Sequence, residues 1–226
     1  MVFHNFSRYD AHLIVSELTT CIGGKLDVIG QNMENYISIT KNVENTDIQF
    51  VFIDSYRFIN VSLDKMGHNL ENSSKKILKK YFPKDEDFNL TSQKAVFPYD
   101  YFDTFEKLLE EKLPSINHFF NKLTDSEICQ EDYQRATSVF NHFKCRNLGE
   151  YADLYLKIDV LLLADIFENF RSTLMSSHSL DPAHFVSLPS YTWECCLKYT
   201  GVELELLSDL DQIMFIERSI RGKFYL

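Results

Sequence analysis

The sequence has 226 residues, of which 45% are hydrophobic, 14% aromatic and 25% charged. This composition excludes a disordered or collagen-like chain, and the short apolar runs give no segment that could span a membrane. The formal net charge of −10 argues against tight non-specific binding of nucleic acid, because Lys and Arg supply affinity for phosphate. The same charge is compatible with carboxylates that bind divalent cations.

The cysteine content and the N-terminus indicate an intracellular protein. Five cysteines are present and none forms a Cys-x2-Cys pair, so we expect no zinc site and buried or half-buried free thiols. The first residues show neither the basic nor the apolar region of a signal peptide. The sequence does not distinguish a nuclear, mitochondrial or viral context.

The first part of the chain mixes strands and helices. Residues 2–4 are typical of the end of a strand, and residues 9–18 carry apolar side chains at helical spacing. Residues 36–40 alternate as in a strand, and the apolar run 48–53 predicts a buried central strand. Ser62 is a predicted N-cap of a further helix.

The second part begins with a polar, turn-rich stretch over 71–85 and contains a predicted helix near 105–111. The last part is mostly helical. Asp125 or Ser126 is expected to cap the helix that leads to Phe143.

The strongest helix is predicted over 149–175, followed by a short helix over 191–199. Strands followed by helices predict a mixed α/β (α+β) fold with a mostly helical C-terminal extension.

Two carboxylates are candidates for chemistry. Tyr155 lies four residues before Asp159, so both project from one face of the long predicted helix. A carboxylate binds a hard cation and a neighbouring phenol can orient a water, as two-metal phosphodiester cleavage requires. The alternative is a solvated helix face on which Lys157 and Asp165 are similar surface charges.

Asn5 and Asp10 are a second candidate pair, near the N-terminus. They follow a predicted strand and precede a helix. The alternative interpretation is a turn residue and a helix cap.

The residues around these candidates resemble the exonuclease motifs of protein-primed family B DNA polymerases, of the organellar, viral and self-synthesising-transposon type. Asn5 to Asp10 is similar to the second motif, and Tyr155 to Asp159 is similar to the third, Tyr-x3-Asp. Further blocks follow in the family's order, at residues 52–58, 97–99, 159–165 and 180–184.

The resemblance implies a role for each matching residue. Asp10 and Asp159 would bind two Mg2+ or Mn2+ ions, and Tyr155 would act with them in catalysis. The contacts to the single-stranded 3′ end would come from Asn5, Tyr9, Ser62, Leu63, Lys94, Arg221 and Gly222. Lys223 stands where the family's loop has a second glycine.

The resemblance also implies a domain organisation. Residues 1–175 would form part of a ribonuclease-H-like 3′–5′ exonuclease domain, and residues 176–226 a helical connection toward the polymerase palm. The first exonuclease motif, Asp-x-Glu, and the palm motifs have no match, and Asp85 to Asp87 lies in a predicted polar loop. We therefore expect a fragment of a polymerase that is inactive alone.

In the parent enzyme, the expected activities are DNA-directed DNA polymerisation and proofreading during DNA replication. The expected partners are single-stranded DNA, a terminal protein primer and the remaining polymerase segments, with no membrane. The alternative function is a non-catalytic helical interaction protein derived from a polymerase.

Overall fold

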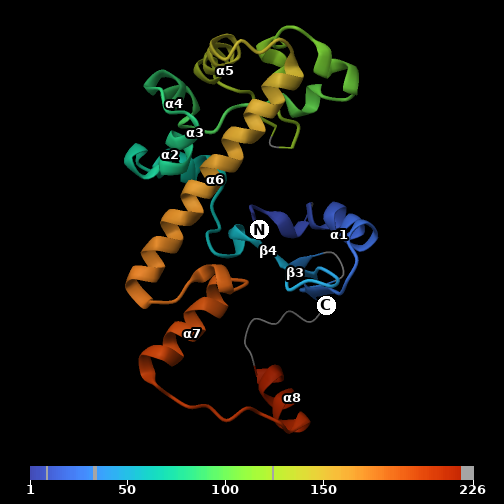
Figure 1. Ribbon diagram of the computed structural model, residues 1–226, viewed down its shortest axis with the longest axis vertical. Helices are drawn as coiled ribbons and strands as arrows, with labels where there is room; N and C mark the ends of the chain where they lie inside the picture. The colour runs from blue at the N-terminus through green and yellow to red at the C-terminus, as the bar shows by residue number, and fades with distance from the viewer. Residues whose placement is uncertain (9, 33–34, 124, 220–226) are drawn as a thin grey trace. The chain divides into compact units, whose positions relative to one another are not determined.

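The computed structural model describes residues 1–8, 10–32, 35–123 and 125–219. The chain divides into two compact units, Met1–Leu188 and Pro189–Leu226, and each is described by itself. The first unit contains a small sheet and a group of helices around one long helix (Figure 1). The mixed α/β class expected from the sequence is confirmed.

The sheet has four strands in the order β1-β4-β3-β2. β1 (Val2–Phe3) pairs parallel with β4 (Gln49–Asp54), and β4 pairs antiparallel with β3 (Tyr36–Asn42). The predicted central position of the 48–53 run is therefore confirmed, but its predicted burial is correct only in part, since Phe52 and Ile53 are buried whereas residues 48–50 are exposed. β2 (Leu26–Gly30) was missed by sequence reasoning, since this edge strand is half exposed and lacks a clear alternation.

The first helix, α1 (Asp10–Cys21), packs on this sheet and confirms the helix predicted over 9–18. Its apolar side chains share a core with the strands, because the 3–4 spacing brings them to one face. The buried members of this core are Phe6, Ala11, Leu18, Ile39 and Phe52.

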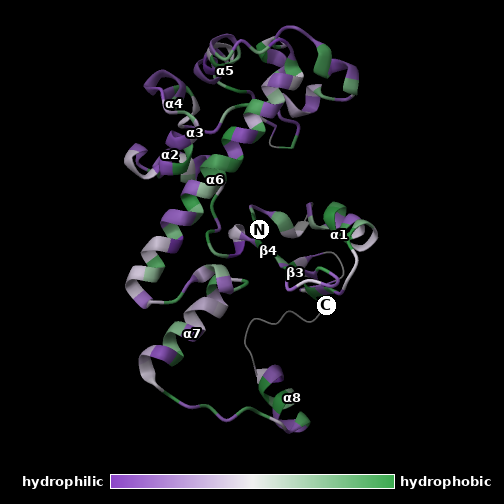
Figure 2. Ribbon diagram, viewed as in Figure 1, coloured by the Kyte–Doolittle hydropathy of each residue, from purple (hydrophilic) through white to green (hydrophobic). Residues whose placement is uncertain are grey.

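The long helix α6 (Leu148–His178) is the helix against which two shorter helices pack. It confirms the helix predicted over 149–175 and is slightly longer at both ends. Asn147 begins it by accepting a hydrogen bond from the Glu150 backbone N–H at 3.0 Å. It ends at Ser179, whose φ of 52° lies in the left-handed region. Its buried side chains recur every three or four residues, and Figure 2 shows hydrophobic and hydrophilic segments alternating along it.

Four shorter helices accompany α6. They are α2 (Leu63–Asn69), α3 (Lys76–Tyr81), α4 (Asp85–Thr91) and α5 (Gln130–His142). Both α2 and α3 contact α6 directly, and Figure 1 shows them beside it. The α3, α4 and α6 side chains form a core of Leu78, Phe82, Phe88, Ile158, Leu161 and Leu162.

Several local predictions in this part were wrong. The stretch over 71–85 was expected to be turn-rich, but it contains α3, and Asp85 to Asp87, expected in a polar loop, form the first turn of α4. The helix near 105–111 is a short 3-10 helix, Phe105–Leu109. Cys129, not Asp125 or Ser126, caps α5, and its sulfur accepts from the Asp132 backbone N–H.

The second unit contains most of α7 (Leu188–Thr200) and α8 (Leu210–Ser219). No helix in the described ranges is both long and apolar enough to cross a membrane. All five cysteines are free thiols, but Cys21, Cys129 and Cys196 are exposed rather than buried.

Candidate functional site

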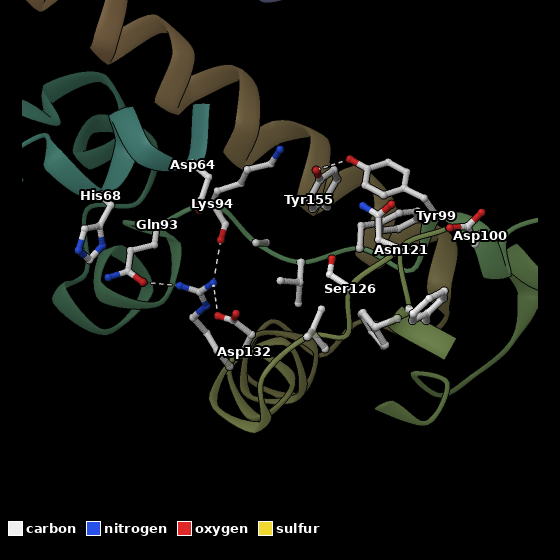
Figure 3. A pocket seen from close by; sticks show the side chains of 17 residues that line it. Asp64, His68, Gln93, Lys94, Tyr99, Asp100, Asn121, Ser126, Asp132 and Tyr155 are labelled. Carbon is white, nitrogen blue, oxygen red and sulfur yellow. Dashed lines mark hydrogen bonds and ion pairs between the residues drawn. The ribbon is translucent and has the colours of Figure 1, made fainter. Parts of the chain in front are cut away.

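A cavity of about 480 Å³ lies beside the N-terminal half of α6. Its wall combines α2, the segment 93–100, residues 119–121, 126 and 128, α5 and Tyr155 of α6. Figure 3 shows the labelled polar side chains that line it, which are Asp64, His68, Gln93, Lys94, Tyr99, Asp100, Asn121, Ser126, Asp132 and Tyr155.

Asp159 contacts two of the lining residues. Its Oδ2 lies 3.6 Å from the Lys94 Nζ, and the Tyr155 hydroxyl, one helical turn earlier, is close enough to influence its pKa. The Oδ1 atom is buried and has no hydrogen-bond partner. Burial raises the pKa of Asp159, and the charge of Lys94 and the nearby Tyr155 hydroxyl oppose this shift.

Tyr155 is buried, and its hydroxyl also hydrogen-bonds the hydroxyl of Tyr99. The Phe97 ring packs against Tyr155 with the ring centroids 5.1 Å apart. Burial, followed by the negative charge of Asp159, raises the pKa of Tyr155. Tyr155 therefore stays a neutral phenol and is not an anionic nucleophile.

Asn5 lies just beyond β1, where the chain turns toward α1. Its φ of 63° is in the left-handed region, which Asn tolerates better than most residues. Its backbone N–H donates to Asp54 Oδ1 at 2.8 Å, so the end of β4 fixes this turn. The carboxylate of Asp54 also accepts from the backbone N–H groups of Ser7 and Tyr56.

Asp10 is the half-buried first residue of α1, where an acidic side chain favours the helix dipole. It is not among the residues that line the cavity. In the described ranges, no group of three or more His, Cys, Asp or Glu side chains could hold a metal ion. Asp159 Oδ1 is buried without a hydrogen-bond partner, but the described residues around it do not make a complete metal site. The pairing of Asp10 with Asp159 stays a prediction.

The predicted DNA contacts at α2 have clear structural roles. Ser62 is the N-cap of α2, and its Oγ accepts from the Lys65 backbone N–H at 3.4 Å, as predicted. Leu63 is buried in a cluster with Met66 and Ile166. Contacts of Ser62 and Leu63 with DNA stay predictions.

Three other predicted site residues, Tyr9, Arg221 and Gly222, lie outside the described residues. Lys94, Tyr155 and Asp159 are thus the predicted site residues that the structure brings together.

Sequence reasoning assigned no role to two residues beside this cluster. Tyr99 bonds Tyr155, and Arg135 of α5 donates to the Lys94 carbonyl at 2.9 Å. No sequence signal marked Arg135, because its partners are far away in the chain. Tyr99 lies in the block at residues 97–99 that resembles the family, but its contact with Tyr155 depends on the tertiary structure.

His4 provides a pH-dependent link at the end of β1. Its Nδ1 lies 3.0 Å from the Ser55 Oγ. Burial lowers the pKa of His4, and the charge of Lys94 acts in the same direction, whereas Asp54 and a hydrogen bond to Val61 oppose it.

We expect His4 to make the protein less stable as the pH falls below about 6.5. The unfolded chain binds a proton at this histidine more readily than the folded chain does, so stability rises with pH up to that value. The melting temperature of the wild type and of His4→Gln should be compared between pH 7.5 and 5. The melting temperature of the wild type should fall more than that of His4→Gln. Equal decreases in the two proteins would contradict the prediction.

The fold and this cluster together describe a mixed α/β protein with a carboxylate, a neutral phenol and a lysine gathered beside one cavity. The family model of DNA polymerase type B, organellar and viral, matches residues 1–195. The chain belongs to this family.

A curated relative from Ascobolus immersus, described as "Probable DNA polymerase", is 27% identical over 195 residues. The match covers 84% of this chain and 14% of the relative, so the chain spans a small part of that protein's length. No solved structure matches significantly.

Proposed function

We propose that this chain carries part of the 3′–5′ proofreading exonuclease centre of a type B DNA polymerase, with Asp159, Tyr155 and Lys94 as its members. The observation that supports this most strongly is the 3.6 Å approach of the Lys94 Nζ to the Asp159 carboxylate, with Tyr155 one helical turn before Asp159 on α6. Lys94 and Asp159 lie far apart in the chain, and the resemblance to the family selected each of them independently.

Each side chain has a distinct chemical task in this proposal. The neutral Tyr155 hydroxyl donates a hydrogen bond that orients the attacking water or a phosphate oxygen. Lys94 offsets negative charge beside the scissile phosphate. Asp159, through its unpartnered Oδ1, and Asp10 would hold the metal ions. Mg2+ or Mn2+, when bound, would supply water activation and charge stabilisation.

The proposed substrate is the 3′ end of single-stranded DNA. Asn5, Ser62 and Leu63 are proposed contacts beyond the catalytic cluster, as the family resemblance implies. A terminal protein primer and the remaining polymerase segments are the proposed partners during DNA replication. The net charge of −10 predicts weak DNA binding by this chain alone.

Hydrolysis of 3′-labelled single-stranded DNA tests the proposal. The 226-residue chain with Mg2+ or Mn2+ should show little or no hydrolysis, because its described residues hold too few metal ligands. In a longer polymerase that includes these residues, Asp159→Asn should slow hydrolysis by at least roughly 100-fold and leave nucleotide incorporation intact. Changes outside the direct ligands of metal centres already cost 10- to 100-fold.

The matched control is Asp153→Asn, since Asp153 is an exposed acid on the same helix. This variant should keep both activities. Unchanged hydrolysis in Asp159→Asn would contradict the proposed centre and favour a non-catalytic interaction protein. Robust hydrolysis by the 226-residue chain, abolished by Asp159→Ala, would contradict its incompleteness.

A further inference from the structure

The segment from Ser92 to Val96 has no regular secondary structure, yet its alternate backbone carbonyls are bonded to side chains. Lys75 Nζ donates to the Ser92 carbonyl at 2.7 Å, and the Tyr151 hydroxyl donates to the Val96 carbonyl at 2.7 Å. Between them, Arg135 donates to the Lys94 carbonyl. Side chains from three different elements therefore take the place of a neighbouring strand.

Arg135 holds this segment at two points. One guanidinium nitrogen, Nη2, donates to the Lys94 carbonyl at 2.9 Å, and the other, Nη1, donates to the Gln93 side-chain carbonyl. Asp132, one helical turn earlier on α5, accepts from Nη2 at 3.0 Å. The rigid, planar fork of arginine suits such a two-point contact, and a lysine offers only a single flexible donor group. Dashed lines in Figure 3 mark these contacts beside Gln93, Lys94 and Asp132.

The placement of Lys94 depends on this backbone. The Lys94 side chain is long and flexible, so its Nζ stays near Asp159 only if the backbone at residue 94 is fixed. Arg135 contacts Lys94 from α5, whereas Asp159 lies on α6, so the lysine is held between two helices. Within the described ranges, Arg135 itself makes no hydrogen bond or ion pair with Asp159 or Tyr155.

We propose that Arg135 is a positioning residue that holds the backbone of Lys94 so that its ammonium group stays against Asp159. The role of Lys94 in hydrolysis rests on the proposed function, but its placement by Arg135 does not. A loss of the two-point contact frees the segment and exposes the Lys94 amine to solvent.

Site-resolved labelling of lysines tests this placement without DNA or metal. The intact chain is treated with a limiting amine-reactive reagent, and modification at each lysine is quantified by mass spectrometry. Arg135→Met should raise the labelling rate of Lys94 by roughly tenfold, as expected for loss of a charge-assisted hydrogen bond that restrains local opening. Lys41, which is buried in the sheet, should keep its low rate.

Two further variants complete the test. Arg146→Met is the matched control, because Arg146 is exposed and its ion-pair partner within the described part of the chain is Glu150, one turn away. This variant should leave the labelling rate of Lys94 unchanged. Arg135→Lys keeps the charge but loses the fork, so it should still raise Lys94 labelling severalfold.

The outcomes separate positioning from general support of the fold. An unchanged Lys94 rate in Arg135→Met, or a wild-type rate in Arg135→Lys, would overturn the proposal. Equal rises at Lys41 and Lys94 would also overturn it, since they would show general loosening. If Arg135→Met raised the labelling rate of Lys94 selectively but the longer polymerase showed no exonuclease activity, the placement of Lys94 by Arg135 would be supported. Only the proposed function would then be rejected.

Discussion

Replacing Asp165 with alanine is expected to lower the free energy of unfolding by about 4 kcal/mol, since this is the cost of removing one partner from a buried charged contact. Asp165 is buried in the middle of α6, and its two carboxylate oxygens accept from the backbone N–H groups of Ile77 and Leu78 at 2.7 and 2.8 Å. Both N–H groups belong to the first turn of α3. The variant leaves both of them, and the buried ammonium of Lys75, without their acidic neighbour.

Urea unfolding of the intact chain measures this effect by linear extrapolation. Asp153→Ala is the matched control, because Asp153 is an exposed acid on the same helix, and it should change stability by less than about 0.5 kcal/mol. Similar losses in both variants would contradict the capping role of Asp165.

The pH dependence of Asp165→Asn gives the same prediction an independent check. Burial lowers the pKa of Lys75 and Asp165 opposes that shift, so the variant should lower the pKa further. A lysine with a lowered folded pKa penalises the folded state while it is protonated, and the penalty disappears as the pH rises toward 10.5. The stability gap between wild type and variant should therefore narrow between neutral pH and about pH 10.

Asp54→Ala should lower the free energy of unfolding by about 3 kcal/mol, because several buried or half-buried donors lose their acceptor. Asp54 is buried at the end of β4 and accepts from the backbone N–H groups of Asn5, Ser7 and Tyr56. The Ser7 hydroxyl donates to the same carboxylate at 2.9 Å. The turn from β1 to α1, which carries Asn5, should loosen first.

Urea unfolding gives the size of the loss, and hydrogen exchange at Asn5 and Ser7 gives its location. Asp47→Ala is the control, since Asp47 is exposed just before the same strand. Unchanged protection of the Asn5 and Ser7 amides in Asp54→Ala would contradict the prediction. Asp54→Asn should also destabilise the protein, because its amide group turns a donor toward these N–H donors.

The elements that the sequence predicted well are those with strong local patterns. The helix over 149–175 carries apolar residues at 3–4 spacing, and the strand over 48–53 is apolar at every residue except Gln49. Both patterns can be read from neighbouring residues in the sequence, although the burial that they predict involves distant parts of the chain. Ser62 was likewise recognised as an N-cap because its acceptor oxygen serves an amide three residues away.

The elements that the sequence missed depend on distant partners. The helix α3 is short and rich in lysine, and its first amides are capped by Asp165 from α6. Asp165 was itself considered a surface charge in one interpretation, yet it is buried. A polar residue within an apolar helical pattern does not reveal whether a distant segment supplies it with a hydrogen-bond partner.

The candidate site shows the same division. Resemblance to family motifs selected Tyr155, Asp159 and Lys94 from the sequence, and the structure places the three together. It did not select Arg135, whose contacts are with a carbonyl and a side-chain amide of the Lys94 segment.

The sequence by itself determined the mixed α/β class, the long helix and the residue types of the candidate site, because periodicity and motif spacing are local properties. The tertiary structure alone decided that Asp165 caps α3, that Asp54 fixes the turn at Asn5, and that Arg135 holds the Lys94 segment. Each of these contacts joins a side chain to backbone or polar groups far away in the chain. A backbone carbonyl or amide looks the same at every residue, so the sequence carries no signal for such a partner.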